Sequence, residues 1–306
     1  MLFCLSWLLQ ILLVLLTVAF FTLFERKVMA LTHLRLGPNK VSLIGLIQPL
    51  LDAFKLLRKQ SLISLRTNKY VYSIAPQLSL FLSLSFWLLI PSYSYLFTNS
   101  LSLLSFLFIG SAIVFANLLA GWRSNSKYTF IGSLRSVAQS ISYESVFTTL
   151  AILICIYTCS YSITSIYQAS SFIILTLLPL WVFSTLAETH RAPFDFSERE
   201  SELVSGYNTE YSGASFAFVF LGEYSSLLFS SSVIYFLFLS PPSSISTNPF
   251  LFSLGTLAVA FIFILIRVTY CRFRYDFLMS LAWKSLLPTS LSLLLLVFLL
   301  SLGILI

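Results

Sequence analysis

Apolar runs long enough to cross a lipid bilayer recur along the whole chain. A hydrocarbon core of ~30 Å needs about 20 apolar residues per helix. Eight stretches meet that length, at residues 3–24, 72–95, 101–121, 138–160, 168–187, 215–240, 250–268 and 285–305. Only 9% of the residues are charged, against about 25% in soluble domains. The sequence therefore predicts an all-α, polytopic membrane protein with eight transmembrane helices in one domain, residues 1–306.

The same runs argue against a transmembrane β-barrel and against a cleaved signal peptide. Barrel strands alternate in ~10-residue segments, whereas Leu286–Leu299 is almost continuously apolar. The first run has no basic residue before it, is too long for a signal peptide, and is followed by Glu25-Arg26-Lys27. We therefore expect the first run to remain in the membrane as a helix.

The basic residues divide the predicted connecting segments into two classes. All 18 Lys and Arg residues lie in the first, third, fifth and seventh segments or at the helix ends beside them. Such residues mark the side of a membrane that is not translocated, so we expect both termini on the opposite side. The net charge of +7 is then a topology signal that requires no nucleic acid. A basic face also suits anionic lipid or an acidic partner.

The first connecting segment contains a shorter, amphipathic helix at about residues 49–59. Its apolar residues Leu50, Phe54 and Leu57 recur with helical spacing, and charged residues occupy the other face. At ~16 Å this helix is too short to span a bilayer, so we expect it to lie at the interface. Either it orients the chain as a surface helix, or it forms a lipid-side gate for an amphiphilic substrate.

Four acidic residues lie inside or at the ends of the predicted spans. Glu144 and Glu223 lie ~10–13 Å into theirs when each helix is counted as continuous, and Glu25 and Glu188 end theirs. All four approach from the basic side, which allows them to converge in one half of the membrane. A carboxylate at the bilayer centre costs roughly 2.5–3.5 kcal/mol, so we expect these side chains to face the bundle interior and to carry protons. The alternative is that they are hydrogen-bonded for packing alone.

Residues 188–214 form an acidic connecting segment. Ser197 and Glu200 have the spacing of a capping box, which predicts a short helix from Ser197 to Gly206. Glu198 and Glu200 can serve the start of that helix. The other acids of the segment have no such local role: Glu188, Asp195, Glu202 and Glu210. We expect no metal site, because His190 is the only histidine here and no carboxylate spacing matches a hard-cation loop.

Nucleotide and catalytic motifs are missing from the sequence. It contains neither a Walker A motif nor a Gly-x-Gly-x-x-Gly fingerprint, so we expect neither ATP nor NADH to bind this chain. It has no nucleophile elbow, and its four cysteines form no Cys-x-x-Cys pair. We therefore expect no complete active site in this chain alone.

Four ordered motifs resemble those of the subunit 1 family of respiratory NADH–ubiquinone oxidoreductase (complex I), most closely its mitochondrial form. The longest is Ala187-Glu-Thr-His-Arg-Ala-Pro-Phe-Asp195, followed by Glu200-Ser-Glu-Leu-Val-Ser-Gly-Tyr-Asn-Thr-Glu-Tyr211. The others are Glu25-Arg-Lys with Gly37-Pro-Asn and Gln48-Pro; Gly121-Trp122 through Ile141-Ser-Tyr-Glu144; and Arg272-Phe-Arg-Tyr-Asp276 with Leu281-Ala-Trp-Lys284. Together they reach every basic segment, so the resemblance covers essentially the whole chain.

The resemblance implies a core membrane subunit of a proton-pumping quinone reductase in the mitochondrial inner membrane, with its termini on the intermembrane side and its basic loops on the matrix side. It implies a ubiquinone channel near Arg26, Arg35, Asp52, Phe54 and Phe220. It implies proton coupling through Glu25, Tyr143, Glu144, Glu188, Asp195, Glu202, Glu210 and Glu223. A loop that faces partner subunits would include Arg191, Glu198, Arg199 and Glu200.

The implied partners are the other membrane-arm and hydrophilic-arm subunits, ubiquinone, and phospholipid, with cardiolipin as a candidate. NADH, flavin and iron–sulfur clusters would be held by partner subunits. The chain departs from the family pattern at His190 (usually Asn), Arg199 (usually a small residue) and Cys271 (commonly Pro). Two other classes remain open from the residues alone: a stand-alone secondary transporter or proton channel, and a passive membrane anchor.

Overall fold

The structure is a computed structural model that describes residues 2–61, 67–90, 100–163, 175–195, 206–239 and 249–304. In those residues every regular element is a helix, which confirms the predicted all-α class. Seven helices of the described part are long and apolar enough to cross a membrane: Trp7–Thr32, Lys69–Leu89, Ser102–Arg123, Lys127–Thr158, Ala214–Leu239, Phe250–Thr269 and Tyr275–Ser301.

The predicted fifth span, 168–187, falls partly outside the described residues. Its described end is α8 (Leu178–Glu188), which at ~16 Å covers about half of a bilayer core. The expected helix from Ser197 to Gly206 also falls almost wholly outside them. The described chain resumes there with a short 3₁₀ turn, Gly206–Asn208.

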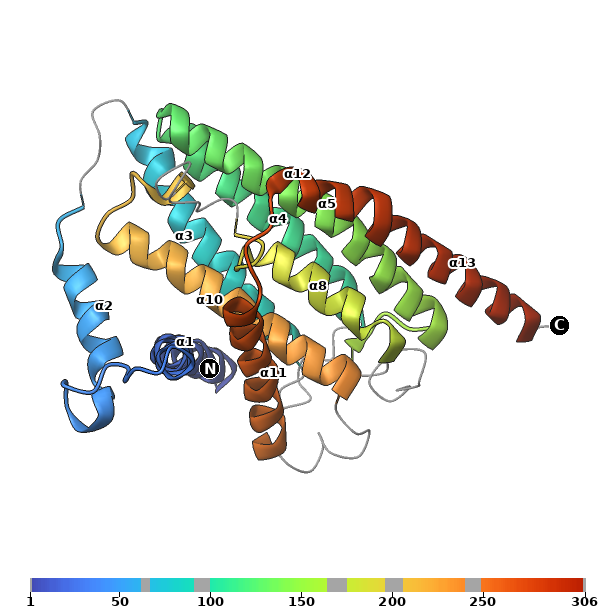
Figure 1. Ribbon diagram of the computed structural model, residues 1–306, viewed down its shortest axis with the longest axis horizontal. Coiled ribbons are helices and arrows are strands. Elements are labelled where there is room, and N and C mark those ends of the chain that lie inside the picture. Colours follow the sequence, from blue (N-terminus) through green and yellow to red (C-terminus); the bar gives the residue numbers. More distant parts are fainter. Residues whose placement is uncertain are drawn as a thin grey trace.

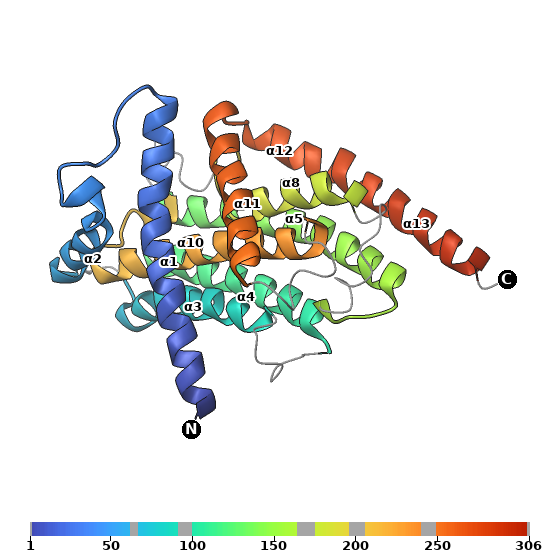
Figure 2. The ribbon, with the colours of Figure 1, turned by 90° about the horizontal axis from the view of Figure 1, so that it is seen from below.

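Helices α3 (Lys69–Ser85), α4 (Ser102–Arg123), α5 (Lys127–Thr158) and α10 (Ala214–Ile234) form the centre of the bundle. Helix α3 packs on α10 and α4, α4 packs on α5, and α5 packs on α8. These helices run in broadly similar directions (Figure 1). Helix α1 (Leu2–Thr32) crosses α10 steeply (Figure 2). The first helix thus packs against α10, which lies in the middle of the second half of the sequence.

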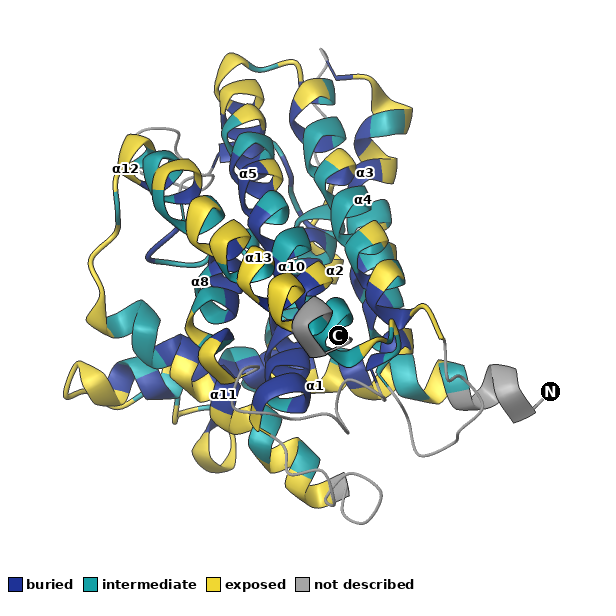
Figure 3. Cartoon of the chain, turned by 90° about the vertical axis from the view of Figure 1, so that its right-hand side faces the viewer, coloured by how far each residue is buried: buried dark blue, intermediate teal, exposed yellow. Residues whose placement is uncertain are grey.

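The remaining helices attach to the edges of the bundle. Helix α11 (Pro249–Thr269) packs on α10 and α1. Helix α12 (Tyr275–Leu281) continues through a π-helical turn, Ala282–Leu286, into α13 (Leu287–Ile304), which packs along α5. The outward side of α13 is largely exposed (Figure 3), and exposed apolar side chains such as Leu295 and Leu299 suit contact with lipid tails or with another apolar helix.

Two helices extend further than the apolar runs predict. Helix α1 continues through Glu25, Arg26 and Lys27 to Thr32, and α5 begins at Lys127, well before the predicted start at 138. A helix satisfies its backbone hydrogen bonds whether or not its side chains are apolar, so hydropathy marks the part inside the bilayer and not the whole helix. Glu144 and Arg135 therefore lie on one continuous helix.

Hydroxyl side chains in the spans are satisfied within their own helix. Ser230, Ser231 and Ser232 of α10 donate to the carbonyls three residues earlier at 2.8, 2.7 and 2.6 Å. An unsatisfied polar group costs several kcal/mol in a bilayer. The local bonds explain how so serine-rich a chain can form membrane helices.

The predicted amphipathic helix is α2 (Gln48–Arg58), with Pro49 in its first turn. It packs on α1 and α10. Leu50, Phe54 and Leu57 remain exposed on it. Its apolar face is therefore available to the membrane interface beside the first helix.

Candidate functional site

Glu25 joins four segments that are far apart in the sequence. Its carboxylate, in α1, accepts hydrogen bonds from Arg191 Nη1 at 3.1 Å and from Tyr224 Oη of α10 at 2.7 Å. It also pairs with Arg267 near the end of α11. Only 4% of the Glu25 side chain is exposed, so the cluster is an internal one that ties α1 to α10, α11 and the segment after α8.

The cluster is rich in positive charge. Two guanidinium groups face the one Glu25 carboxylate, and the Arg191 guanidinium also lies 3.9 Å from the centre of the Tyr224 ring. Burial disfavours the charged form of Arg191, but Tyr224, Glu25 and Glu223 favour it more strongly, and the pKa of Arg191 is held above its usual value. Arg191 is therefore a fixed cation between two acidic side chains of different helices.

The segment after α8, residues 189–195, is held by buried backbone contacts. Gln139 of α5 is fully buried, and its Nε2 donates to the carbonyls of Ala187 at 2.8 Å and Phe194 at 2.9 Å. The Phe273 amide donates to the Pro193 carbonyl at 3.2 Å. The Ala192–Pro193 peptide bond is cis. These contacts fix the direction in which His190 and Arg191 leave the end of α8.

Asp195, at the end of that segment, pairs with Arg272 at 3.6 Å. Arg272 belongs to the connection between α11 and α12. Asp195 thus links two predicted basic-side segments.

Glu144 and Glu188 face one cavity of about 60 Å³ between α4, α5, α8 and α10. Its wall combines aromatic rings with polar side chains, namely Phe86, Phe106, Phe147, Trp181 and Phe229 with Asn117, Ser140, Thr185, Thr189, His190, Ser226 and Ser230. Gly110 of α4 lets the wall close on Glu188, because a Cβ there would lie 3.3 Å from Oε1. The two predicted carboxylates are therefore brought together.

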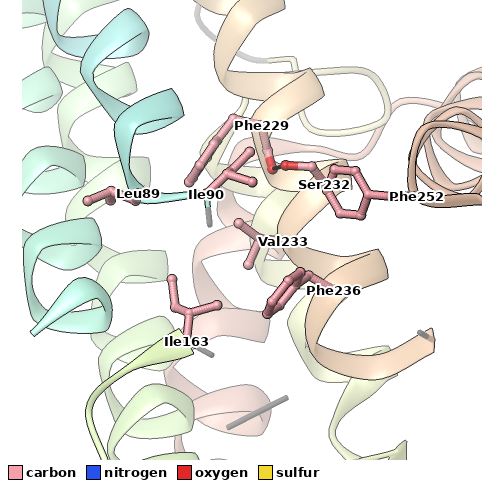
Figure 4. Close-up of a pocket in the computed structure, with 8 residues that line it drawn as sticks. All are labelled: Leu89, Ile90, Ile163, Phe229, Ser232, Val233, Phe236 and Phe252. Carbon is pink, nitrogen blue, oxygen red and sulfur yellow. Dashed lines mark hydrogen bonds between the residues drawn. The ribbon is translucent and has the colours of Figure 1, made fainter. Parts of the chain in front are cut away.

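A smaller apolar pocket of about 10 Å³ adjoins this cavity and shares Phe229 and Val233 with it. Its other walls are Leu89, Ile90, Ile163, Ser232, Phe236 and Phe252 (Figure 4). Ser232 is its single polar lining residue, and its hydroxyl already donates to the Phe229 carbonyl at 2.6 Å. The pocket has no polar group aimed into it and offers no chemistry of its own.

Glu223 of α10 also interacts electrostatically with Arg191. Its Oε1 accepts a hydrogen bond from Tyr207, which follows Gly206 at the resumption of the described chain. Glu210 is nearby in sequence, and its carbonyl accepts a 2.5 Å bond from Tyr72 of α3. Tyr72 in turn stacks on Tyr211 with ring centroids 4.3 Å apart. The end of the acidic segment is thus packed on α3 and α10.

Tyr143 has a different neighbourhood from the carboxylates that it was predicted to join. It is buried, and its hydroxyl donates to the Leu278 carbonyl of α12 at 3.1 Å. It does not line the cavity that Glu144 lines. Tyr143 therefore contributes to the contact between α5 and α12.

The predicted quinone-channel residues lie on α1, α2, α10 and the segment between α1 and α2. Arg26 pairs with Asp52 at 2.8 Å, and Gln48 Nε2 donates to the same carboxylate at 3.1 Å. Phe54 is 64% exposed, Phe220 packs on Phe216 at 4.4 Å, and Arg35 is exposed. These groups line an outer face of the fold, where α2 packs on α1 and α10.

Four predicted site residues lie outside the described residues: Glu198, Arg199, Glu200 and Glu202. In the part of the chain that the structure does describe, no three His, Cys, Asp or Glu side chains gather as a metal site would require. The described chemistry is that of carboxylates, tyrosines and guanidinium groups.

Sequence reasoning did not identify Arg267, Tyr224, Tyr207 or Gln139 as site residues. Tyr224 carries a usable signal, because it is adjacent to the intramembrane Glu223. Gln139 carries one as well, since an amide within an apolar span needs hydrogen-bond partners. In the sequence Arg267 indicates only the topology, and the packing of α11 on α1 is what brings it to Glu25.

Comparisons with known proteins agree with one family. The sequence profile of the NADH dehydrogenase family matches residues 5–298. NADH-ubiquinone oxidoreductase chain 1 of Anopheles gambiae is 45% identical over 290 residues, which are 93% of this chain and 91% of that protein. The chain 1 protein of Aedes aegypti is 46% identical over 93% of this chain, and that of Heterololigo bleekeri is 44% identical over 92% of it. In both cases the match covers 91% of the relative's own length. The profile match takes in the residues of the Glu25 cluster and of the carboxylate cavity. This chain therefore belongs to the NADH dehydrogenase family that includes NADH-ubiquinone oxidoreductase chain 1.

Proposed function

We propose that this chain is a core membrane subunit of proton-pumping NADH–ubiquinone oxidoreductase, which forms the ubiquinone access channel and couples quinone reduction to proton translocation. The observation that carries the coupling role is the shared cavity of Glu144 and Glu188. The family membership supports the oxidoreductase as the setting.

The cavity suits proton transfer for a physical reason. Two carboxylates that face one small space repel each other when both are ionised, so a proton held between them is favoured. Intramembrane acids of this kind mark proton relays in membrane transport proteins. Arg191, three residues after Glu188, interacts with both Glu25 and Glu223, so a change in charge at either of these two acidic groups acts on the other through Arg191.

Quinone access is assigned to the outer face formed by α1, α2 and α10. The Arg26–Asp52 pair fixes α2 beside α1, and Phe54 and Leu57 are exposed on α2. An isoprenoid tail in the bilayer would meet these apolar side chains before the headgroup reached the interior. Arg35 and Phe220 would complete the path on either side of α2.

The remaining roles concern partners and orientation. The acidic segment 188–214 would face the hydrophilic-arm subunits, which would hold NADH, flavin and iron–sulfur clusters. The protein would lie in the mitochondrial inner membrane among the other membrane-arm subunits and phospholipid, with both termini on the intermembrane side and the basic segments on the matrix side.

Replacement of each cavity acid in the assembled complex tests the coupling role. Glu144→Gln and Glu188→Gln keep the side-chain volume and remove the titratable proton. Both should allow assembly and lower coupled NADH–ubiquinone reductase activity severalfold, with fewer protons pumped per NADH. Asp276→Asn is the control, because Asp276 is exposed and does not line the cavity. Normal pumping in both cavity variants would refute the role.

Co-purification tests whether the chain is a subunit of the oxidoreductase. After mild detergent extraction the chain should travel with NADH-oxidising, cluster-bearing subunits. A chain that is extracted alone and still conducts protons would favour a stand-alone transporter or proton channel.

A further inference from the structure

Tyr207 connects the end of the acidic segment 188–214 to an acidic side chain inside a membrane helix. Its hydroxyl donates a hydrogen bond to Oε1 of Glu223, which lies within the span Ala214–Leu239. Tyr207 itself belongs to the 3₁₀ turn Gly206–Asn208, before that span begins, and it is buried. The bond therefore couples a connecting segment to a carboxyl group of α10.

The backbone that carries Tyr207 lies directly on helix α5. A Cβ added to Gly132 of α5 would be 3.0 Å from Gly206 Cα and from the Tyr207 amide nitrogen, so the two segments meet through backbone atoms. Gly206 has a φ of 60°, in the left-handed region that glycine adopts readily. The Tyr211 amide donates to the Asn208 carbonyl at 3.1 Å and closes the following turn. These contacts give the phenol a defined position.

The ring of Tyr207 packs in a small apolar cluster. The cluster includes Ala75 of α3, Ala120 of α4 and Val219 of α10. A buried phenol hydroxyl needs a hydrogen-bond partner, and Glu223 accepts its bond. Because the surrounding helices fix the ring, the hydroxyl can in turn fix the direction of the Glu223 side chain.

Glu223 and Glu25 are held by the same two kinds of partner. Both interact electrostatically with the Arg191 guanidinium. Glu25 also accepts a hydrogen bond from Tyr224 at 2.7 Å, and Glu223 accepts one from Tyr207. Hydrogen bonds to an ionised group are roughly twice as strong as neutral ones. Each phenol therefore orients one of the two acidic groups that Arg191 connects.

We propose that Tyr207 is a positioning residue for proton coupling at Glu223. Its hydroxyl holds the Glu223 carboxyl group in one orientation within reach of the charge of Arg191, so a rearrangement at the end of the acidic segment changes the surroundings of an intramembrane acid. The phenol keeps its own proton and acts through the hydrogen bond. This inference rests on the proposed coupling function and adds to it the residue that orients Glu223.

Tyr207→Phe tests this role, because it removes the hydroxyl and keeps the buried ring. In the assembled complex we expect this variant to pump severalfold fewer protons per NADH. NADH oxidation by an artificial acceptor that bypasses quinone should stay normal. Tyr211→Phe is the matched control, since Tyr211 lies in the same apolar cluster and its hydroxyl donates to the Tyr72 carbonyl at 3.4 Å. The control should pump normally.

A double substitution separates the positioning of Glu223 from a general effect on packing. Glu223→Gln removes the titratable group and should lower pumping severalfold. If Tyr207 acts through Glu223, the addition of Tyr207→Phe to Glu223→Gln should cause no further loss, because coupled residues are not additive. A packing defect would instead reduce pumping by the same factor in both backgrounds, and that result would overturn the inference.

Infrared difference spectroscopy of the complex reports the hydrogen bond itself. The carboxyl band that Glu223→Gln removes should shift in Tyr207→Phe, because the C=O bond loses a hydrogen-bond donor, and should keep its frequency in Tyr211→Phe. A band that does not shift in Tyr207→Phe would overturn the inference.

The outcomes also separate this inference from the proposed function. If Glu223→Gln lowers pumping and Tyr207→Phe does not, the role of Tyr207 alone fails. If Glu144→Gln, Glu188→Gln and Glu223→Gln all pump normally, the proposed coupling function fails, and the role of Tyr207 fails with it.

Discussion

The carboxylate of Glu25 accepts a 3.1 Å hydrogen bond from Arg191, a residue 166 positions further along the chain. The bond joins the first helix to the segment that follows α8, and Tyr224 and Arg267 bind the same carboxylate. Because that segment also carries His190 and follows Glu188, the Glu25–Arg191 pair fixes one end of the carboxylate cavity. Its loss should affect both the stability of the fold and the geometry of the site.

Glu25→Gln should lower the temperature at which the assembled complex loses activity. Removing one partner of a buried ion pair costs about 3–5 kcal/mol, because the remaining charge is left uncompensated, and here two guanidinium groups lose the carboxylate. Asp276→Asn is the matched control, since the Arg274–Asp276 pair is 82% and 78% exposed and an exposed pair contributes about 0–1 kcal/mol. Equal shifts of the inactivation temperature in the two variants would show that the Glu25 cluster does not stabilise the fold.

Substitutions on α2 should distinguish quinones by the length of their tails. Asp52→Leu removes the partner of Arg26, and Phe54→Asp places a charge on the exposed apolar face. Both should raise the apparent KM severalfold for long-tailed quinones and less for short-tailed ones, because the tail and not the headgroup meets this face. Lys55→Gln, on the same helix, is the control. Steady-state kinetics with both quinone types provide the measurement, and an unchanged KM ratio would contradict the assignment.

Two native thiols should report the orientation of the chain. Cys159 follows α5 and Cys271 follows α11, and both are exposed in this chain. The distribution of Lys and Arg predicts that they lie on opposite faces of the membrane. In a Cys4→Ser background, a membrane-impermeant maleimide added from the intermembrane side should modify Cys159 and spare Cys271, with the reverse result in inverted vesicles. Modification of both thiols from one side would contradict the predicted sidedness.

The stability of the protein should fall in mildly acidic solution because of His190. Its pKa is about 4 in the fold against an ordinary value of 6.5. Below pH 6.5 the imidazole of the unfolded chain is protonated, whereas that of the folded chain stays neutral down to about pH 4. The free energy of unfolding therefore decreases as the pH falls from 6.5 towards 4, and it levels off below pH 4. The shift corresponds to at most ~3.4 kcal/mol.

His190→Asn should remove that part of the pH dependence. The temperature of activity loss, measured between pH 7.5 and pH 5, should decline less steeply in the variant than in the unmodified complex. His33→Asn should leave the slope unchanged, because His33 is exposed. A variant whose decline matches that of the unmodified complex would show that His190 is not buried as a neutral group.

The class of the protein, most of its membrane helices and its family could be predicted from the residues alone. Runs of about twenty apolar residues can satisfy their backbone in a bilayer only as helices, and seven of the described helices follow those runs. The spacing of Leu50, Phe54 and Leu57 predicted the amphipathic helix that α2 forms at Gln48–Arg58. The sequence also singled out Glu144, inside an apolar run, and Glu188, at the end of one, because a carboxylate in such a place is conspicuous without any knowledge of its neighbours.

Which of these groups meet depends on how the helices pack. Glu25, Arg191 and Arg267 come together only because α1 packs on α10 and α11, and no local rule connects residues that are 166 and 242 positions apart. Tyr143 and Glu144 are adjacent in sequence, yet the turn of the helix sends one towards the Leu278 carbonyl and the other into the cavity. Helical periodicity gives the angle between two neighbouring side chains, whereas the helices packed around them determine what each side chain contacts. That is why the sequence could identify the acidic groups of this protein, and why only the packed bundle could assign their partners.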